Sequence, residues 1–195
     1  MTNQKLWTSE EEPKMTAMSQ PMQVLTSQES VEWYTPSEYV EMVREVLGDI
    51  DLDPASSETP QQWIRAKTYW TAGDDGLSRR WFGRVFLNPP YPAAEWARYM
   101  VKQWRNGALE PSIALVNANL GYAWFEELWT RYPVCFVKER IFFVGQDGKG
   151  GQSKKASAFL YFGDAPFKFN HTFKSIGRVI MPDAGSSRAE NGLFR

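Results

Sequence analysis

Residues 85–92 of the 195-residue chain, VFLNPPYP, end an apolar run with an amide, two prolines and an aromatic ring. Proline fixes its own φ and holds the preceding residue out of the helical region, so Asn88 is extended and its side chain has a set direction. No helix can form here to use the carbonyl of Pro89. The Asn88 side chain and the Pro89 carbonyl therefore offer two rigid hydrogen-bond acceptors at the end of a strand.

Two acceptors in this arrangement suit an exocyclic amine such as N6 of adenine, which has two N–H donors and a lone pair delocalised into the ring. When both hydrogens are accepted, the nitrogen becomes pyramidal and its lone pair is free to attack an electrophile, which is an electrostatic preorganisation. Tyr91 would stack on the base, and Pro90 would keep the turn stiff so that little reorganisation is needed. This chemistry requires no nucleophilic side chain and no strong general base.

The pattern along the chain predicts an α/β fold. Strands are predicted at 49–54, 83–88, 112–119, 134–144 and 157–163, and helices at 35–48, 93–107 and 122–132, with a short helix within 55–66. Alternation of this kind is typical of a mostly parallel sheet. The last two strands are joined by residues 145–155, which are rich in Gly, Lys and Ser and are predicted to be a flexible link. These two strands predict an antiparallel hairpin at the C-terminal end.

A second polar group follows the first of the predicted strands, where Asp53, Pro54, Ala55 and Ser56 come directly after Leu52. Ligands of open α/β sheets bind outside the carboxyl ends of the strands. The loop that begins at Asp53 and the loop that begins at Asn88 are therefore predicted to face one crevice. Strand alternation would place Asp51 on the same face as Asp53.

The composition excludes several classes of protein and several kinds of functional site. The net charge is −1, so a nucleic-acid partner would need a local basic patch. With only Cys135 and His171 as cysteine and histidine, we expect no disulfide framework, no Ser-His-Asp triad and no metal site. No 18-residue apolar run or signal-peptide pattern is present, so we expect a cytoplasmic protein with no membrane contact. Residues 31–182 are predicted to form one domain between a disordered tail, 1–30, and a flexible tail, 183–195.

With these motifs in place, the chain resembles phage-type DNA N6-adenine methyltransferases of the Dam-like group. The resemblance runs from about Trp33 to Phe162 and is carried by EWYTP (32–36), GDIDLDPAS (48–56), DDGLSRRWFGRVFLNPPY (74–91) and KERIFFV (138–144). It implies a Rossmann-like methyltransferase fold that uses S-adenosylmethionine. The loop after Asp53 lacks the usual Gly-x-Gly, and the span from Pro54 to Val85 is short, which suits an abbreviated form of that fold. The resemblance also implies a phage or prophage protein in a bacterial host.

The resemblance also implies site residues. Asn88, Pro89, Pro90 and Tyr91 would form the catalytic motif, and Asn88 would also border the cofactor. The cofactor-binding residues would be Tyr34, Thr35, Pro36, Asp51, Asp53, Pro54, Ala55, Ser56 and Asp75. Thr35 and Pro36 would lie beside the methionine end of the cofactor, and Asp75 would contact its adenosine. Double-stranded DNA would be the partner, and its adenine would flip out of the helix to reach the site.

The basic residues Arg140, Lys149, Lys154 and Lys155 are the candidates for contacting DNA, with Lys138 on the preceding strand in support. Mobile basic loops commonly provide phosphate contacts. Two alternatives remain open from the sequence. One keeps the cofactor but methylates RNA or a protein glutamine, whose amide also suits the Asn88 motif. The other is a catalytically inactive DNA-binding module, which the shortened cofactor region would favour.

Overall fold

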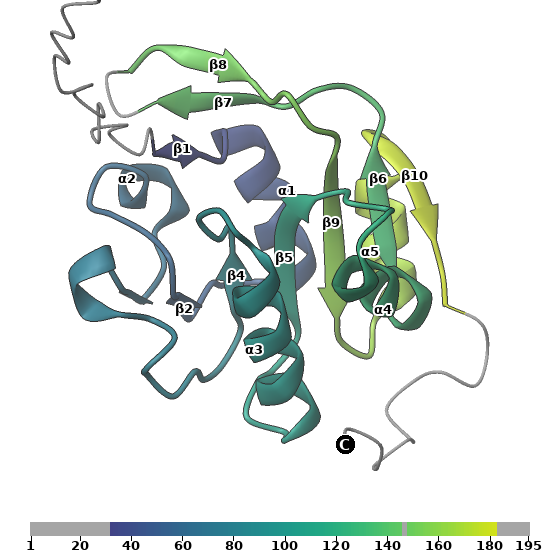
Figure 1. Ribbon diagram of the computed structural model, residues 1–195, viewed down its shortest axis with the longest axis horizontal. Helices are drawn as coiled ribbons and strands as arrows, with labels where there is room; N and C mark the ends of the chain where they lie inside the picture. The colour runs from purple at the N-terminus through teal and green to yellow at the C-terminus, as the bar shows by residue number, and fades with distance from the viewer. Residues whose placement is uncertain (1–31, 146–147, 183–195) are drawn as a thin grey trace, which may run out of the picture. The chain divides into compact units, whose positions relative to one another are not determined.

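A five-stranded mixed sheet lies at the centre of the folded chain in the computed structural model, which describes residues 32–145 and 148–182 (Figure 1). Across the sheet the strands are β10 (Gly177–Ile180), β6 (Val134–Val137), β9 (Ser157–Phe162), β5 (Ser112–Asn117) and β4 (Phe86–Leu87). Only β4 and β5 are parallel neighbours; the other three pairs are antiparallel.

Two smaller sheets flank the central one. The parallel pair β2 (Leu52–Asp53) and β3 (Thr68–Tyr69) is joined to it by a parallel bridge between Leu52 and Val85. The antiparallel sheet contains β1 (Trp33–Tyr34), β7 (Phe142–Gly145) and β8 (Gly150–Gln152). Because this bridge is parallel, β2 and β4 run in the same direction, and their carboxyl ends lie at the same edge of the sheet.

The α/β class is confirmed, but the prediction of a mostly parallel sheet is wrong for the central sheet. Both β5 and β6 are antiparallel to β9, so they share one direction, and β9 lies between them. Parallel neighbours need a crossover connection, whereas the chain reaches β9 from β6 through the β7–β8 hairpin without a helix. The antiparallel pairing of the last two predicted strands is confirmed as the pair β6 and β9.

The strand predicted at 134–144 is two strands in different sheets, β6 and β7. The chain leaves the central sheet after Val137, where Lys138, Glu139 and Arg140 are all exposed. Three consecutive charged residues cannot continue a strand buried on both faces. The link predicted at 145–155 contains β8, which pairs with β7. Gln146, Asp147 and the predicted tails 1–30 and 183–195 lie outside the described residues.

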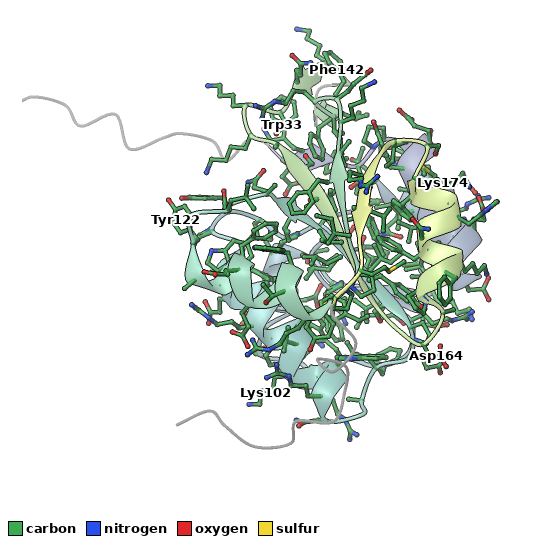
Figure 2. The ribbon with its side chains drawn as sticks, turned by 90° about the vertical axis from the view of Figure 1, so that its right-hand side faces the viewer. Trp33, Lys102, Tyr122, Phe142, Asp164 and Lys174 are labelled. Carbon is green, nitrogen blue, oxygen red and sulfur yellow. The ribbon has the colours of Figure 1, made fainter. Side chains whose placement is uncertain are left out.

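Helices cover both faces of the central sheet, and Figure 2 shows the sheet edge-on between them. One face carries α1 (Ser37–Leu47) and α5 (Pro166–Phe173), and the other carries α3 (Ala94–Arg105) and α4 (Ala123–Arg131). The short helix α2 (Gln61–Ile64) and the 3₁₀ helix η1 (Ala72–Asp74) lie in the connection between β2 and β4. Within the described residues, none of the helices combines the length and the apolar character that a membrane span requires.

Side-chain alternation in β5 explains why both faces are covered. Ile113 and Leu115 belong to the core under α1 and α5, whereas Ala114 and Val116 belong to the core under α3 and α4. A strand that is apolar on both sides has to be buried on both sides. Helix α1 was predicted from its apolar spacing, whereas residues 164–182 were assigned no element and contain α5 and β10. The apolar residues of α5 are mostly phenylalanines in only eight positions, too few for a clear helical period.

Candidate active site

A cavity of about 310 Å³ opens at the carboxyl ends of β2 and β4, in the range of small-molecule sites. Both strands point toward it because they are parallel. Its walls are formed by Glu32, Trp33, Tyr34, Thr35, Asp53, Pro54, Ala55, Ser56, Pro60, Ile64, Thr71, Ala72, Asp75, Gly76, Asn88, Pro90 and Trp96. The single crevice expected from the strand ends is therefore present.

Most of the predicted site residues meet in this cavity. Those in its walls are Tyr34, Thr35, Asp53, Pro54, Ala55, Ser56, Asp75, Asn88 and Pro90. Four others are not in the walls: Pro36, Asp51, Pro89 and Tyr91. Pro36 is buried as the N-cap residue of α1, and Tyr91 is 76% exposed, so its ring is open to a ligand that arrives from solvent.

Asn88 is oriented by a backbone group from a distant part of the chain. It follows β4, whose Phe86 and Leu87 are fully buried and anchor the strand end. Its Nδ2 atom donates a hydrogen bond of 3.1 Å to the carbonyl oxygen of Trp33 in β1. The amide nitrogen is thereby engaged, and Oδ1 is the end of the side chain left to accept a hydrogen bond from a ligand. This is the orientation that an amine-binding role requires.

Asp53 is a buried carboxylate in the cavity wall, only 2% exposed. Its Oδ2 atom accepts a 2.9 Å hydrogen bond from Gln61 Nε2, which also donates to Ser56 Oγ at 2.8 Å. Its Oδ1 atom accepts a longer one, 3.4 Å, from the backbone N–H of Ala55. Burial raises the pKa of Asp53 to about 6, because these neutral donors only partly replace water. Asp53 therefore offers a carboxylate to a donor or cation that enters the cavity.

Thr35 gives the cavity a polar side-chain atom that has no hydrogen-bond partner among the described residues. The Thr35 side chain is buried, and its Oγ1 atom forms no hydrogen bond with the described residues. The backbone at this position is fixed, because Trp63 Nε1 donates a 2.8 Å hydrogen bond to the Thr35 carbonyl. A buried hydroxyl without a partner is unfavourable, so a ligand that pairs with it would be stabilised.

Another part of the cavity wall is shaped by a tight turn at Asp75 and Gly76. Asp75 has a φ of 50°, and a Cβ atom at Gly76 would collide with the carbonyl oxygen of Pro54. Glycine is therefore required where the two loops touch. The Gly76 carbonyl accepts a 2.7 Å hydrogen bond from Nε1 of Trp81, which is fully buried. This contact ties the cavity wall to the core.

Asp51 lies apart from the cavity, contrary to the expectation from strand alternation. Its carboxylate forms ion pairs of 2.7 Å with Arg84 Nε and 2.8 Å with Lys67 Nζ. Arg84 also donates its backbone N–H to Asp51, and together these contacts hold the pKa of Asp51 well below its usual range. The regular strand is only Leu52–Asp53, so these two basic partners, and not alternation, decide where the Asp51 side chain lies.

The family model for DNA N-6-adenine-methyltransferase (Dam) matches residues 23–186 of the chain. The chain is a member of the Dam family. The match covers every wall of the cavity and both loops that the strand ends carry, and it confirms the resemblance drawn from the motifs. At the level of the family, the activity is methylation of DNA at adenine N6. Comparison with curated proteins gave no match.

The basic residues expected to contact DNA surround the β7–β8 hairpin of this Dam-family chain. Arg140 precedes β7, Lys149 lies in the turn between the two strands, and Lys154 and Lys155 follow β8; all four are exposed. The Nζ atom of Lys155 lies 4.9 Å from the centre of the Tyr91 ring. This cation–π contact places one of the basic residues directly beside the loop that carries Asn88.

Several residues of the Dam-family cavity were not predicted from the sequence. Trp96 lies in the helix predicted at 93–107; it packs against Trp81 and also lines the cavity. Glu32 and Trp33 lie within the motif EWYTP, and their position in that motif was the only signal that could have found them. Gln61 is not in the cavity wall but donates hydrogen bonds to the wall residues Asp53 and Ser56. The sequence gives no signal for this role, because it depends on partners that folding brings close to Gln61. Within the described residues, no group of three metal-ligating side chains occurs.

Proposed function

We propose that this chain transfers the methyl group of S-adenosylmethionine to N6 of an adenine that has flipped out of double-stranded DNA. The observation that carries the proposal is the Asn88 side chain, whose nitrogen is held by Trp33 at the edge of the cavity. An amide held in this way presents a fixed acceptor to an amine. Family membership supports the acceptor atom and the type of nucleic acid.

The cavity suits a cofactor of this chemistry. S-adenosylmethionine would supply a methyl group bonded to a positively charged sulfur. Its ammonium and ribose groups are donors, and the cavity walls offer the carboxylates of Glu32, Asp53 and Asp75 and the free hydroxyl of Thr35. None of the wall residues, all of them in the described part of the chain, is Lys, Arg or His. The proline, isoleucine and tryptophan side chains give an apolar surface for an adenine ring.

In the proposed site, Tyr34, Thr35, Asp53, Pro54, Ala55, Ser56 and Asp75 bind the cofactor. Asp51 is omitted because its carboxylate is engaged by Arg84 and Lys67. Pro36 acts indirectly, by starting α1 directly after Thr35.

Around the target amine, Asn88 Oδ1 would accept one N–H and the Pro89 carbonyl the other, so that the nitrogen lone pair is free to form the new N–C bond. Tyr91 would stack on the adenine from the solvent side. The proton lost from N6 would leave to water, because the arrangement needs no strong base. Binding the base outside the helix would leave the DNA contacts to Arg140, Lys149, Lys154 and Lys155.

The test is a transfer assay with tritiated S-adenosylmethionine and unmethylated plasmid DNA, followed by digestion to nucleosides. Label is expected in N6-methyladenine, and Asn88→Ala is expected to lower the rate by about 10²–10³-fold, as for loss of one preorganised polar contact. Asn106→Ala, at the exposed C-terminal end of α3, is the matched control and should retain full activity.

The same assay separates the alternatives. If the protein binds S-adenosylmethionine but labels no DNA, RNA and a glutamine-containing peptide become the acceptors to test. If it binds DNA without binding the cofactor, the chain is an inactive DNA-binding module. Because the proposed reaction takes place on DNA, we also propose a cytoplasmic location in a bacterial cell; the phage or prophage origin stays a prediction.

A further inference from the structure

The loop that follows β5 begins beyond the end of β4, at the same edge of the central sheet as the loop that carries Asn88. Strands β4 and β5 are parallel, and Leu87 at the end of β4 is level with Ala114. Strand β5 continues for three more residues, to Asn117. At about 3.3 Å per residue, β5 therefore extends roughly 10 Å past the strand end from which Asn88 follows.

A hydrogen-bonded turn at residues 119–122 forms the end of this projection. The N–H of Tyr122 donates to the carbonyl of Asn119 at 2.9 Å, and the N–H of Ala118 donates to the carbonyl of Ala156 at 2.8 Å. The turn is therefore fastened both internally and to the segment that leads into β9. The backbone at its tip is therefore held in place, and little backbone entropy is lost when the tip binds a partner.

The tip of the turn is apolar and does not pack against the protein. Leu120 is 62% exposed, and a Cβ atom at Gly121 would have no atom within 4 Å. Tyr122 is also largely exposed, and Figure 2 shows it projecting from the surface. An exposed leucine alone is common in proteins. Here it occupies the tip of a fastened turn at the edge of the sheet that carries the candidate active site.

Contacts already described connect this turn to the catalytic loop and to a positive charge. Ala156, which anchors the turn, is the neighbour of Lys155, and Lys155 lies against the Tyr91 ring. The base of the turn, at Ala118, is therefore connected to Tyr91 through Ala156 and Lys155, and Lys155 is a cation suited to a phosphate. Both features fit a surface that faces the DNA backbone and the base stack together.

We propose that the turn 119–122 is a DNA-facing wedge, in which Leu120 inserts into the base stack when the target adenine leaves it. The proposal rests on the proposed function, because only a flipped base leaves a space to fill. Apolar side chains inserted between bases offset the cost of unstacking them. An enzyme that flips its target bears this cost at every turnover, and it is lowest for a base that is poorly paired.

The test uses purified full-length protein and a duplex that carries the target sequence, first mapped from the wild-type product. Leu120→Ala is expected to lower the methylation rate on the paired duplex by about tenfold, without changing the Kd for S-adenosylmethionine. On the same duplex with an abasic site opposite the adenine, the variant should come within about threefold of the wild type. Leu120→Met keeps a large apolar tip and should retain most of the activity.

Phe167→Ala is the matched control, because Phe167 is 81% exposed but lies in α5, lining a different cavity together with Asp164. Figure 2 shows Asp164 on the opposite side of the view from Tyr122. An equal loss on both duplexes, an equal loss in the control, or no loss in Leu120→Ala would overturn the wedge. A wild type that transfers no methyl group to any DNA would overturn the proposed function, and the wedge with it. The activity of the wild type alone therefore distinguishes failure of the proposed function from failure of the wedge.

Discussion

Replacing Asp53 by Asn is expected to stabilise the fold and weaken the site. The pKa of Asp53 is about 6 in the folded protein, against about 3.9 for an unfolded aspartate. A carboxyl whose pKa is raised by folding is better tolerated when protonated. The contribution of Asp53 to stability is therefore most favourable below pH 4 and becomes less favourable as the pH rises from about 4 to 6. The full difference of about 2 pKa units corresponds to about 3 kcal/mol.

The substitution Asp53→Asn removes this pH-dependent cost. One of the hydrogen bonds from Gln61 and Ala55 is lost with the second carboxylate oxygen, at about 1 kcal/mol. The net gain in the free energy of unfolding should therefore be about 2 kcal/mol at pH 8 and close to zero at pH 4.5. For a chain of this length, 2 kcal/mol raises Tm by about 4–8 °C.

Urea denaturation of the wild type and the variant at pH 4.5 and pH 8 measures the effect, with Asp164→Asn, an exposed aspartate away from the candidate active site, as the control. The affinity for S-adenosylmethionine should fall by about tenfold or more in Asp53→Asn, because a charged hydrogen bond is replaced by a neutral one. A variant that is no more stable at pH 8, or whose gain is the same at both pH values, would refute the reasoning about burial.

Three further outcomes are expected. Trp81→Phe removes the hydrogen bond to the Gly76 carbonyl and part of a fully buried ring, so it should cost about 2–4 kcal/mol in urea denaturation and weaken cofactor binding; unchanged values for both would contradict the link between core and cavity. Burial raises the pKa of Cys135 to about 12, so a thiol reagent at pH 8 should label the native protein only as fast as it unfolds, and immediate labelling would show the thiol to be accessible. Lys155→Ala should weaken DNA binding and lower the slope of log K against log salt by about 0.9, with cofactor affinity unchanged; an unaltered slope would exclude a phosphate contact.

The sequence was informative where a local rule and the tertiary structure agree. Two prolines after an apolar strand determine the extended backbone at Asn88 without help from the rest of the chain. The short strand predicted before Asp53 indicated that the loop after it lies at the same edge of the sheet as Asn88, because ligand-binding loops follow the carboxyl ends of strands. The motif-based resemblance to the Dam family was confirmed over residues 23–186. All of these depend on residue types and spacing within a few positions.

Tertiary structure decided which groups face one another across long stretches of chain. The hydrogen bond from Asn88 to Trp33 spans 55 residues, and the ion pair of Arg84 with Asp51 spans 33. Neither partner can be read from local pattern, because the free energy of such contacts depends on where the sheets bring them. The position of β9 between β5 and β6 also depends on the tertiary structure. Strand propensity indicates that each strand exists, but the packing on both faces of the sheet determines which strands are neighbours. The sequence by itself thus determined the Asn-Pro-Pro-Tyr motif and its backbone. Only the folded structure decided the partner that orients Asn88, the buried state of Asp53 and the position of Asp51 outside the cavity.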